Sequence, residues 1–131
     1  MLWARPVAYI FIRPTRYTKE FVDASDHMTL SVFDKKYKPM MQYFGTVSGR
    51  DEDKIAKSAP TLCEHGAYTY FEEARLTMLT KKLYAQPLAE DCFTEAAVNP
   101  QEQKDDPRIH YPAHDYHTMY IAEIEHVLIK E

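Results

Sequence analysis

The strand-forming segments of this chain are unevenly spaced and do not alternate regularly with helices, and this spacing constrains the fold most. Strand-like runs lie at residues 6–12, 27–33, 68–71, 75–85 and 117–129. Regular strand–helix alternation would indicate a doubly wound parallel sheet, and the chain lacks it. Residues 87–108 are polar and acidic, and they predict a long excursion with one helical turn near residues 90–97. We therefore predict a mainly β protein, a barrel with short helical decorations.

The strand patterns differ in how many faces they bury. Residues 6–12 are almost entirely apolar, which is typical of a strand buried on both faces. Residues 27–33 alternate in polarity, which predicts a half-buried strand. The residues expected to share one face of the last strand are Tyr120, Ala122, Ile124 and Leu128. Two strands carry apolar residues on both faces, and a small monomer can hardly bury both faces of each. We therefore expect a homodimer in which a second subunit covers the remaining face.

Short helices are predicted between the strands. They span residues 19–24, 37–44 and 51–57. Thr18 has the chemistry of an N-cap for the first helix, in which Phe21 and Val22 are expected to face inward. Gly45 is the expected end of the second helix, and Ser48 is the expected N-cap of the third.

Length, charge and cysteine content limit the class of protein. A chain of 131 residues favours one domain, residues 1–131. The formal net charge of -4 argues against a nucleic-acid partner, because such proteins carry a basic surplus. Cys63 and Cys92 are far apart and indicate a reducing compartment. No run has transmembrane length and the start lacks the pattern of a signal peptide, so a cytoplasmic location is expected.

The stretch Arg13-Pro14-Thr15-Arg16-Tyr17-Thr18 places two guanidinium groups and two threonine hydroxyls at a strand end, just before a predicted helix. A phosphate monoester carries about -1.5 to -2 charge and three acceptor oxygens. Arginine offers a planar fork that matches these oxygens, and hydroxyls and free N–H groups at a helix start add donors. The stretch therefore indicates a phosphate site; a solvated basic loop that caps a helix is the alternative.

A second stretch, Gly45-Thr46-Val47-Ser48-Gly49-Arg50-Asp51-Glu52-Asp53-Lys54, repeats these features. It offers small residues, hydroxyls, an arginine and a predicted helix start. The alternative is a capped helix on which Arg50 and Lys54 pair with nearby carboxylates. Two such stretches in one small acidic chain favour a shared anionic ligand.

Other patterns are weaker. His110, His114 and His117 match no strong metal-ligand spacing, so no metal site is predicted. The chain has neither a nucleophile triad nor a recognisable pair of carboxylates, so no catalytic side chain is predicted.

On these stretches the sequence resembles the flavin reductase-like, FMN-binding split-barrel family, and the flavoredoxin-like branch in particular. The likeness rests on residues 5–8, 12–18, 44–54 and 115–124, in the order that the family has them. It covers nearly the whole chain, and the second and third stretches are the most specific.

The resemblance implies a split β-barrel that forms a homodimer and binds FMN near the subunit interface. The residues that it implies as phosphate and ribityl contacts are Arg13, Thr15, Arg16 and Thr18. Those that it implies as a second cradle are Ser48, Gly49, Arg50 and Lys54. Tyr17 and the Asp115-Tyr116-His117 turn are expected to border the flavin or substrate cleft.

The sequence departs from the family pattern at its start. Family members carry an N-terminal strand and a loop that contact the flavin, and this chain begins after that segment. The resemblance therefore implies a barrel that lacks one strand and exposes an edge.

The leading functional hypothesis is an NAD(P)H-dependent flavin reductase or a related oxidoreductase. In such an enzyme FMN carries the electrons, while the protein supplies position and electrostatics. One alternative is an FMN-binding electron carrier that serves a partner protein and has no hydride donor of its own. Another is a non-enzymatic barrel that no longer binds flavin.

Overall fold

The structure of the protein is a computed structural model that describes residues 1–46, 48–51, 53–55 and 60–131. Its strands are β1 (Val7–Ile12), β2 (His27–Val32), β3 (Leu62–His65), β4 (Tyr68–Phe71), β5 (Leu76–Pro87) and β6 (Thr118–Ile129). Its α-helices are α1 (Thr18–Ala24), α2 (Lys38–Thr46) and α4 (Glu95–Val98). Its 3₁₀ helices are η1 (Lys35–Tyr37), η2 (Glu90–Cys92), η3 (Gln103–Asp105) and η4 (Pro107–His110). None of the described helices is both long enough and apolar enough to cross a membrane.

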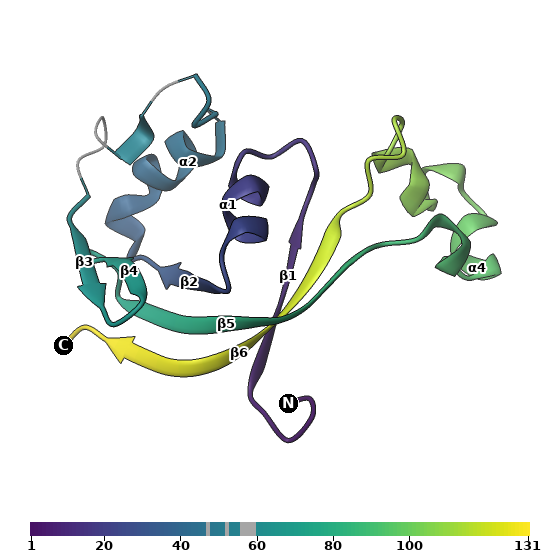
Figure 1. The fold of residues 1–131 in the computed structure, drawn as a ribbon. Helices are drawn as coiled ribbons and strands as arrows, with labels where there is room; N and C mark the ends of the chain where they lie inside the picture. The colour runs from purple at the N-terminus through teal and green to yellow at the C-terminus, as the bar shows by residue number, and fades with distance from the viewer. Residues whose placement is uncertain (47, 52, 56–59) are drawn as a thin grey trace.

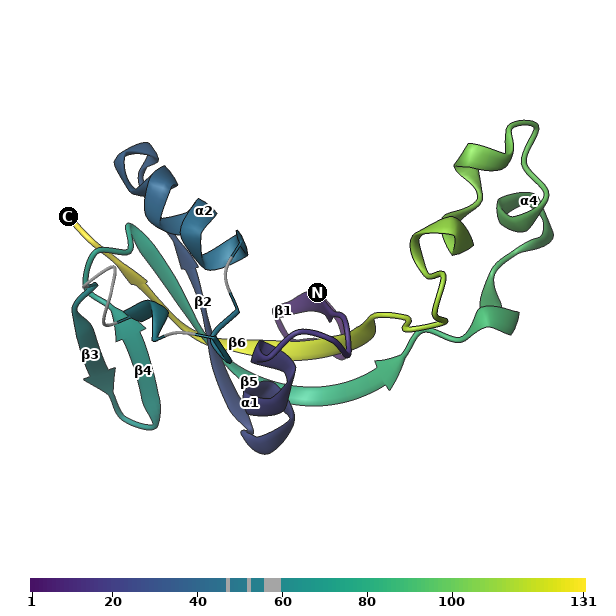
Figure 2. The same ribbon diagram turned by 90° about the horizontal axis from the view of Figure 1, so that it is seen from above.

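Four strands form one antiparallel sheet in the order β1-β6-β5-β2, and β3 and β4 form a separate hairpin. The two longest strands, β5 and β6, pair along their whole length and curve beneath α1 and α2 (Figures 1 and 2). Register shifts between Leu79 and Thr80 and between Lys82 and Tyr84 interrupt this ladder. Such irregularities bend a strand and increase its twist, which accounts for the curl of the sheet. The predicted mainly β fold with short helices is confirmed.

The strands β1, β2, β4, β5 and β6 lie at the predicted segments, whereas β3 was not predicted. Strand β3 is short and largely exposed, so it has no apolar pattern that would mark it. The sequence feature that marks this hairpin is its turn. His65 pairs with Tyr68 across a two-residue loop in which Gly66 has φ +60°. Positive φ at glycine is typical of tight hairpin turns.

The helix predictions need three corrections. Tyr17, not Thr18, is the N-cap of α1, and no side chain caps this helix. Phe21 does not face inward: it is 59% exposed and packs edge-on against Tyr17, with ring centroids 4.9 Å apart, while Val22 is buried. Helix α2 does not end at Gly45 but continues to Thr46.

The predicted helix at residues 51–57 falls partly outside the described residues, because 52, 56 and 57 are not described. Residues 49–51 form a turn, in which the N–H of Asp51 donates to the carbonyl of Ser48 at 3.0 Å. The Ser48 hydroxyl accepts from the N–H of Arg50 at 3.1 Å, so Ser48 closes this turn.

The core positions α1 on one face of the sheet. Tyr120 of β6 and Leu79 of β5 are fully buried. The Tyr120 hydroxyl donates to Oδ1 of Asp23 at 2.6 Å, and Nζ of Lys82 donates to the carbonyl of Val22 at 2.8 Å. Buried polar groups need such partners, so these bonds hold the C-terminal part of α1 on the sheet.

Around Tyr9 of β1 and Tyr84 of β5, no described element covers the opposite face of the sheet, and we call this area the uncovered sheet face. Tyr9 and Phe11 of β1 are 50% and 51% exposed, so the expectation that β1 is buried on both faces is wrong for the single chain. Strand β1 lies at the sheet edge, and α1 covers only the other face. Ile121 of β6 pairs with Tyr9 on one side and with Tyr84 of β5 on the other, and Tyr84 is also exposed.

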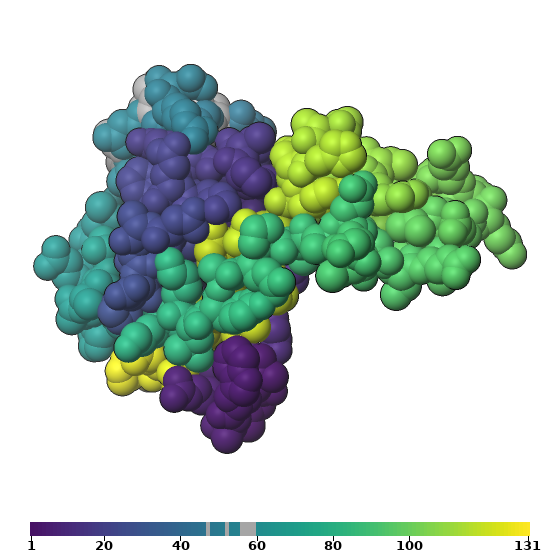
Figure 3. Space-filling view, turned by 45° about the vertical axis from the view of Figure 1, so that its right-hand side comes forward, coloured from purple at the N-terminus to yellow at the C-terminus, as the bar shows by residue number. Residues whose placement is uncertain are grey.

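Residues 88–117 form the excursion between β5 and β6, which extends beyond the predicted residues 87–108, and they project from the body of the molecule (Figure 3). The single predicted helical turn is correct in part, because α4 is accompanied by three 3₁₀ helices. Asp106 caps the last of these by accepting from the N–H of Arg108 at 2.9 Å. The Arg108 guanidinium, which also donates to this carboxylate, lowers the pKa of Asp106.

Candidate functional site

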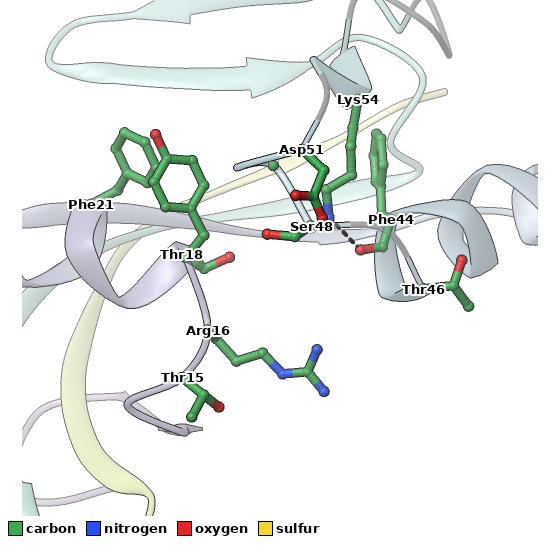
Figure 4. Close-up of a pocket in the computed structure, with 11 residues that line it drawn as sticks. Thr15, Arg16, Thr18, Phe21, Phe44, Thr46, Ser48, Asp51 and Lys54 are labelled. Atoms are coloured by element: carbon green, nitrogen blue, oxygen red, sulfur yellow. Dashed lines mark hydrogen bonds between the residues drawn. The ribbon is translucent and has the colours of Figure 1, made fainter.

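Two segments far apart in sequence meet in a hollow of about 330 Å³, which we call the first hollow (Figure 4). The residues from the turn before α1 and from α1 itself are Thr15, Arg16, Tyr17, Thr18 and Phe21. The residues from the end of α2 and the following turn are Phe44, Thr46, Ser48, Gly49, Asp51 and Lys54. The first hollow thus brings together all the predicted site residues except Arg13 and Arg50.

The donors in the first hollow come from both segments. Arg16 is exposed, and among the described residues no hydrogen bond or ion pair engages its guanidinium group. Figure 4 shows the hydroxyls of Thr18 and Ser48 pointing toward one another from the two segments. A guanidinium group with unengaged N–H donors beside hydroxyl groups can donate several strong hydrogen bonds to phosphate or carboxylate oxygens.

A close contact between Tyr17 and Gly49 joins the two segments. A Cβ atom at Gly49 would lie 2.9 Å from Cδ2 of the Tyr17 ring, closer than real carbon atoms approach. The absence of a side chain at Gly49 therefore lets the second segment lie against the aromatic ring of the first. The edge-on contact with Phe21 supports the same ring from α1.

Arg50, on the second segment, lies outside the first hollow and contacts the first segment. Its guanidinium lies over the Tyr17 ring, 4.9 Å from the ring centre. Nη1 donates to the carbonyl of Thr15 at 3.2 Å, and Nη2 pairs with Oε1 of Glu20 at 2.6 Å. These bonds engage the Arg50 guanidinium in holding the two turns in place, whereas no described residue engages the guanidinium of Arg16.

Lys54 and Asp51 complete the second segment. Nζ of Lys54 donates to the carbonyl of Phe44 at 2.6 Å, which ties the turn back to the end of α2. The Asp51 carboxylate also lines the first hollow, where it offsets part of the positive charge of Arg16 and Lys54. The site therefore carries a small net positive charge in an acidic protein.

Arg13 lies beside the first hollow and not in its wall. Its Nη2 donates to the carbonyl of His110 at 2.8 Å and to Oδ1 of Asp115 at 3.0 Å. Its guanidinium also lies 5.1 Å from the centre of the Tyr111 ring. Arg13 therefore holds the end of the excursion against the end of β1. Among the described residues, its buried Nε has no hydrogen-bond partner.

An ion pair on α1 supports the first segment. Nζ of Lys19 donates to Oδ2 of Asp23 at 2.6 Å. This bond, followed by the one from the Tyr120 hydroxyl, lowers the pKa of Asp23. The bond to Asp23 likewise raises the pKa of Lys19, against the smaller opposing effect of burial. Both shifts favour the charged forms that hold α1 on the sheet.

The sequence prediction missed part of the first hollow. The residues it missed are Phe21, Phe44, Thr46 and Asp51. Phe21 was assigned to the core because it follows the apolar spacing of a buried helix face. Thr46 and Asp51 lie within the predicted second stretch but were not assigned as ligand contacts, and Phe44 directly precedes that stretch. Among the described residues, no group of three or more His, Cys, Asp or Glu side chains is arranged to hold a metal ion.

Comparison with solved structures gives clear fold matches. An FMN-binding protein from Thermus thermophilus with bound p-hydroxybenzaldehyde has a TM-score of 0.69 at 16% identity, over 97% of this chain and 57% of its own. The flavoredoxin of Desulfovibrio vulgaris (Miyazaki F) has a TM-score of 0.66 at 22% identity, over 96% and 54%. Nitrilotriacetate monooxygenase component B from Bacillus cereus has a TM-score of 0.69 at 14% identity, over 96% and 55%.

The chain thus spans slightly more than half the length of the solved structures that it matches. No protein-family model matches the chain, and no curated protein matches it.

Proposed function

The chain has the fold of the FMN-binding split-barrel proteins, and from this premise and the first hollow we propose that it is a flavoprotein that binds FMN. In this proposal the guanidinium of Arg16 and the hydroxyls of Thr15, Thr18 and Ser48 hold the phosphate. The observation that carries the proposal is the exposed Arg16 guanidinium, which has no partner among the described residues and lines the same hollow as the Ser48 hydroxyl of the second segment.

The side chains that line the first hollow are chemically suited to bind FMN. A doubly charged phosphate needs several donors in one place, and Arg16 with its neighbouring hydroxyls supplies them. The single acidic residue in the wall, Asp51, is outnumbered by Arg16 and Lys54. Tyr17, Phe21 and Phe44 offer aromatic surface at the same hollow, as a cofactor with a flat ring system requires.

Bound FMN supplies two-electron redox chemistry, and the protein supplies binding and orientation. We propose oxidoreductase activity of the flavin reductase kind, with NAD(P)H as the electron donor. The side chains of the first hollow anchor and orient the phosphate end; they include no group that must act as an acid or a base.

We also propose that the protein works as a homodimer. The uncovered sheet face carries Tyr9 and Tyr84, and Ile121 lies between them. The first hollow, at about 330 Å³, is at the lower end of the range of roughly 300–1,000 Å³ for ligand sites. A second subunit against this face would bury the aromatic side chains and add walls to the flavin site.

The visible absorption spectrum of the purified protein, followed by titration with FMN, tests the proposal. We expect saturable FMN binding with one site per chain, because each chain carries one first hollow. Protein that stays colourless and cannot be saturated with FMN would reject the proposal.

Consumption of NADH and NADPH by the FMN-bound protein then tests the reductase activity. We expect turnover with at least one of the two donors. Bound FMN without turnover would leave an electron carrier that depends on a partner protein.

A further inference from the structure

A second cationic surface lies away from the first hollow, where β2 ends and β5 begins. It surrounds a hollow of about 520 Å³, which we call the basic hollow, lined by Phe33, Asp34, Lys35, Lys36 and Arg75. The basic hollow shares no lining residue with the first hollow. Its charged groups are therefore separate from those proposed to hold the phosphate of FMN.

The lining of the basic hollow carries an excess of positive charge. Lys35, Lys36 and Arg75 outnumber the one carboxylate, Asp34. Asp34 is a weak partner, because its Oδ1 lies 3.6 Å from Nε of Arg75 and the two side chains are 57% and 60% exposed. Among the described residues, no hydrogen bond or ion pair engages the ammonium group of Lys35, and that of Lys36 lies 5.1 Å from the centre of the Tyr37 ring. Positive charge is thus available to an anionic partner.

The charge of the rest of the chain directs an acidic protein to this surface. The formal net charge of the whole chain is -4, which repels an acidic protein from most orientations. Cationic groups gathered at one place attract it there, and such steering raises the rate of association. The exposed lysines suit a protein surface better than a small anion, because sites for small ligands enclose most of the ligand surface.

Backbone hydrogen bonds hold the basic hollow in shape. The N–H of Arg75 donates to the carbonyl of Val32 at 2.7 Å, and the carbonyl of Arg75 accepts from the N–H of Lys130 at 3.0 Å. The N–H of Tyr37 donates to the carbonyl of Asp34 at 3.0 Å, which closes the turn before α2. A partner would meet cationic groups whose backbone positions are already set, and this lowers the entropy cost of docking.

A row of aromatic rings connects the basic hollow with the first hollow. Phe33 lines the basic hollow, and its ring centroid lies 5.9 Å from that of Phe71 on β4. The ring centroid of Phe71 lies 6.4 Å from that of Phe44, which lines the first hollow. A protein docked at the basic hollow would thus be joined to a flavin in the first hollow through three packed rings.

We propose that the basic hollow is the docking surface for a small acidic electron-transfer protein of the iron–sulfur class. The charge favours an acidic surface, and the ring contacts to the first hollow favour an electron carrier over other acidic proteins. Such a carrier passes one electron at a time, so two docking events, with two protons exchanged with solvent, would serve each two-electron change of FMN. That role rests on the proposed function, whereas the docking itself does not.

An acidic plant-type [2Fe–2S] ferredoxin is the probe, and isothermal titration of the FMN-saturated and the FMN-free protein measures its binding. We expect saturable binding to both forms, with one ferredoxin per chain. Binding should weaken by roughly tenfold or more between ionic strengths of about 0.01 and 0.15 M, because salt screens exposed charges.

Charge-reversal variants locate the docking surface. Lys35→Glu and Lys36→Glu should each weaken ferredoxin binding by roughly threefold or more, and together by roughly tenfold or more. Lys104→Glu is the matched control, because it makes the same charge change on an exposed lysine of the excursion. It should leave ferredoxin binding nearly unchanged. Circular dichroism of each variant verifies that it is folded.

Three results would overturn the inference: absent ferredoxin binding at low salt, equal ferredoxin affinity in wild type and the folded Lys35 and Lys36 variants, or an equal loss in Lys104→Glu. A short single-stranded DNA that binds more tightly than ferredoxin and loses affinity in the Lys35 and Lys36 variants would make the surface a nucleic-acid site and also overturn it.

The absorbance of ferredoxin tests the class of partner. Docked ferredoxin that exchanges no electrons with the chemically reduced, FMN-bound protein would overturn the assigned class. Ferredoxin that docks at the basic hollow of a protein that never binds FMN would reject the proposed function and retain the docking surface.

Discussion

At the scale of single residues, the contact between Tyr17 and Gly49 determines whether the two halves of the first hollow meet. The second segment can approach only because position 49 has no side chain. Arg50 and Phe21 hold the Tyr17 ring from two other directions, so the ring has little room to move aside.

Gly49→Ala should therefore destabilise the protein by about 1–3 kcal/mol, the usual cost of overpacking, and should weaken FMN binding. Gly45→Ala is the matched control. Position 45 lies in α2 with open space around it, so alanine there should stabilise the protein by about 0.5–1 kcal/mol. Urea denaturation of both variants measures the difference. Equal effects of the two substitutions would show that the Tyr17 contact does not constrain the site.

At the scale of elements, α1 is the support of the first segment, and its attachment depends on charge. Asp23 accepts from Lys19 and from the buried Tyr120 hydroxyl, and both donors lower its pKa. A carboxyl with a lowered pKa stabilises the fold above its unfolded-state pKa of about 3.9. This contribution is lost as the pH falls through the lower pKa of the folded state.

Asp23→Asn should remove that part of the acid sensitivity. We expect wild type to lose stability relative to Asp23→Asn as the pH falls below about 4. Tyr120→Phe, which leaves the Lys19 pair in place, should remove only part of the difference. Urea midpoints measured from neutral to acidic pH provide the test. Parallel loss of stability in wild type and Asp23→Asn would contradict this account of α1.

The elements also show how far the sequence could predict the structure. Long strands with clear periodicity, such as β5 and β6, could be located because a buried face imposes the pattern. Strand β3 could not, because it buries little. Phe21 was assigned to the core because its apolar side chain follows the spacing of a buried helix face. In the structure this side chain lines the first hollow and is largely exposed. The two stretches with basic and hydroxyl side chains could be recognised from the sequence, and the structure brings them to one hollow. The bonds that engage Arg13 and Arg50 could not be predicted, because they depend on tertiary partners.

At the scale of the whole molecule, the proposed homodimer accounts for the uncovered sheet face. Tyr9→Lys and Tyr84→Lys should each lower the fraction of dimer, because they place a charge where a subunit would pack. Met41→Lys is the control, since Met41 is similarly exposed but lies on α2. Sedimentation velocity measures the native mass. A wild-type monomer at all concentrations, or a dimer that neither tyrosine substitution weakens, would contradict the proposed interface.

The central claim is that Arg16 binds the phosphate of FMN in the first hollow. The most direct test compares the affinities of wild type and Arg16→Gln for FMN and for riboflavin, which lacks the phosphate, with Arg75→Gln as the control. Charge-assisted hydrogen bonds contribute about 1.5–3 kcal/mol, so Arg16→Gln should weaken FMN by roughly tenfold or more and leave riboflavin unchanged. Equal losses for FMN and riboflavin, or no loss for FMN, would contradict the claim.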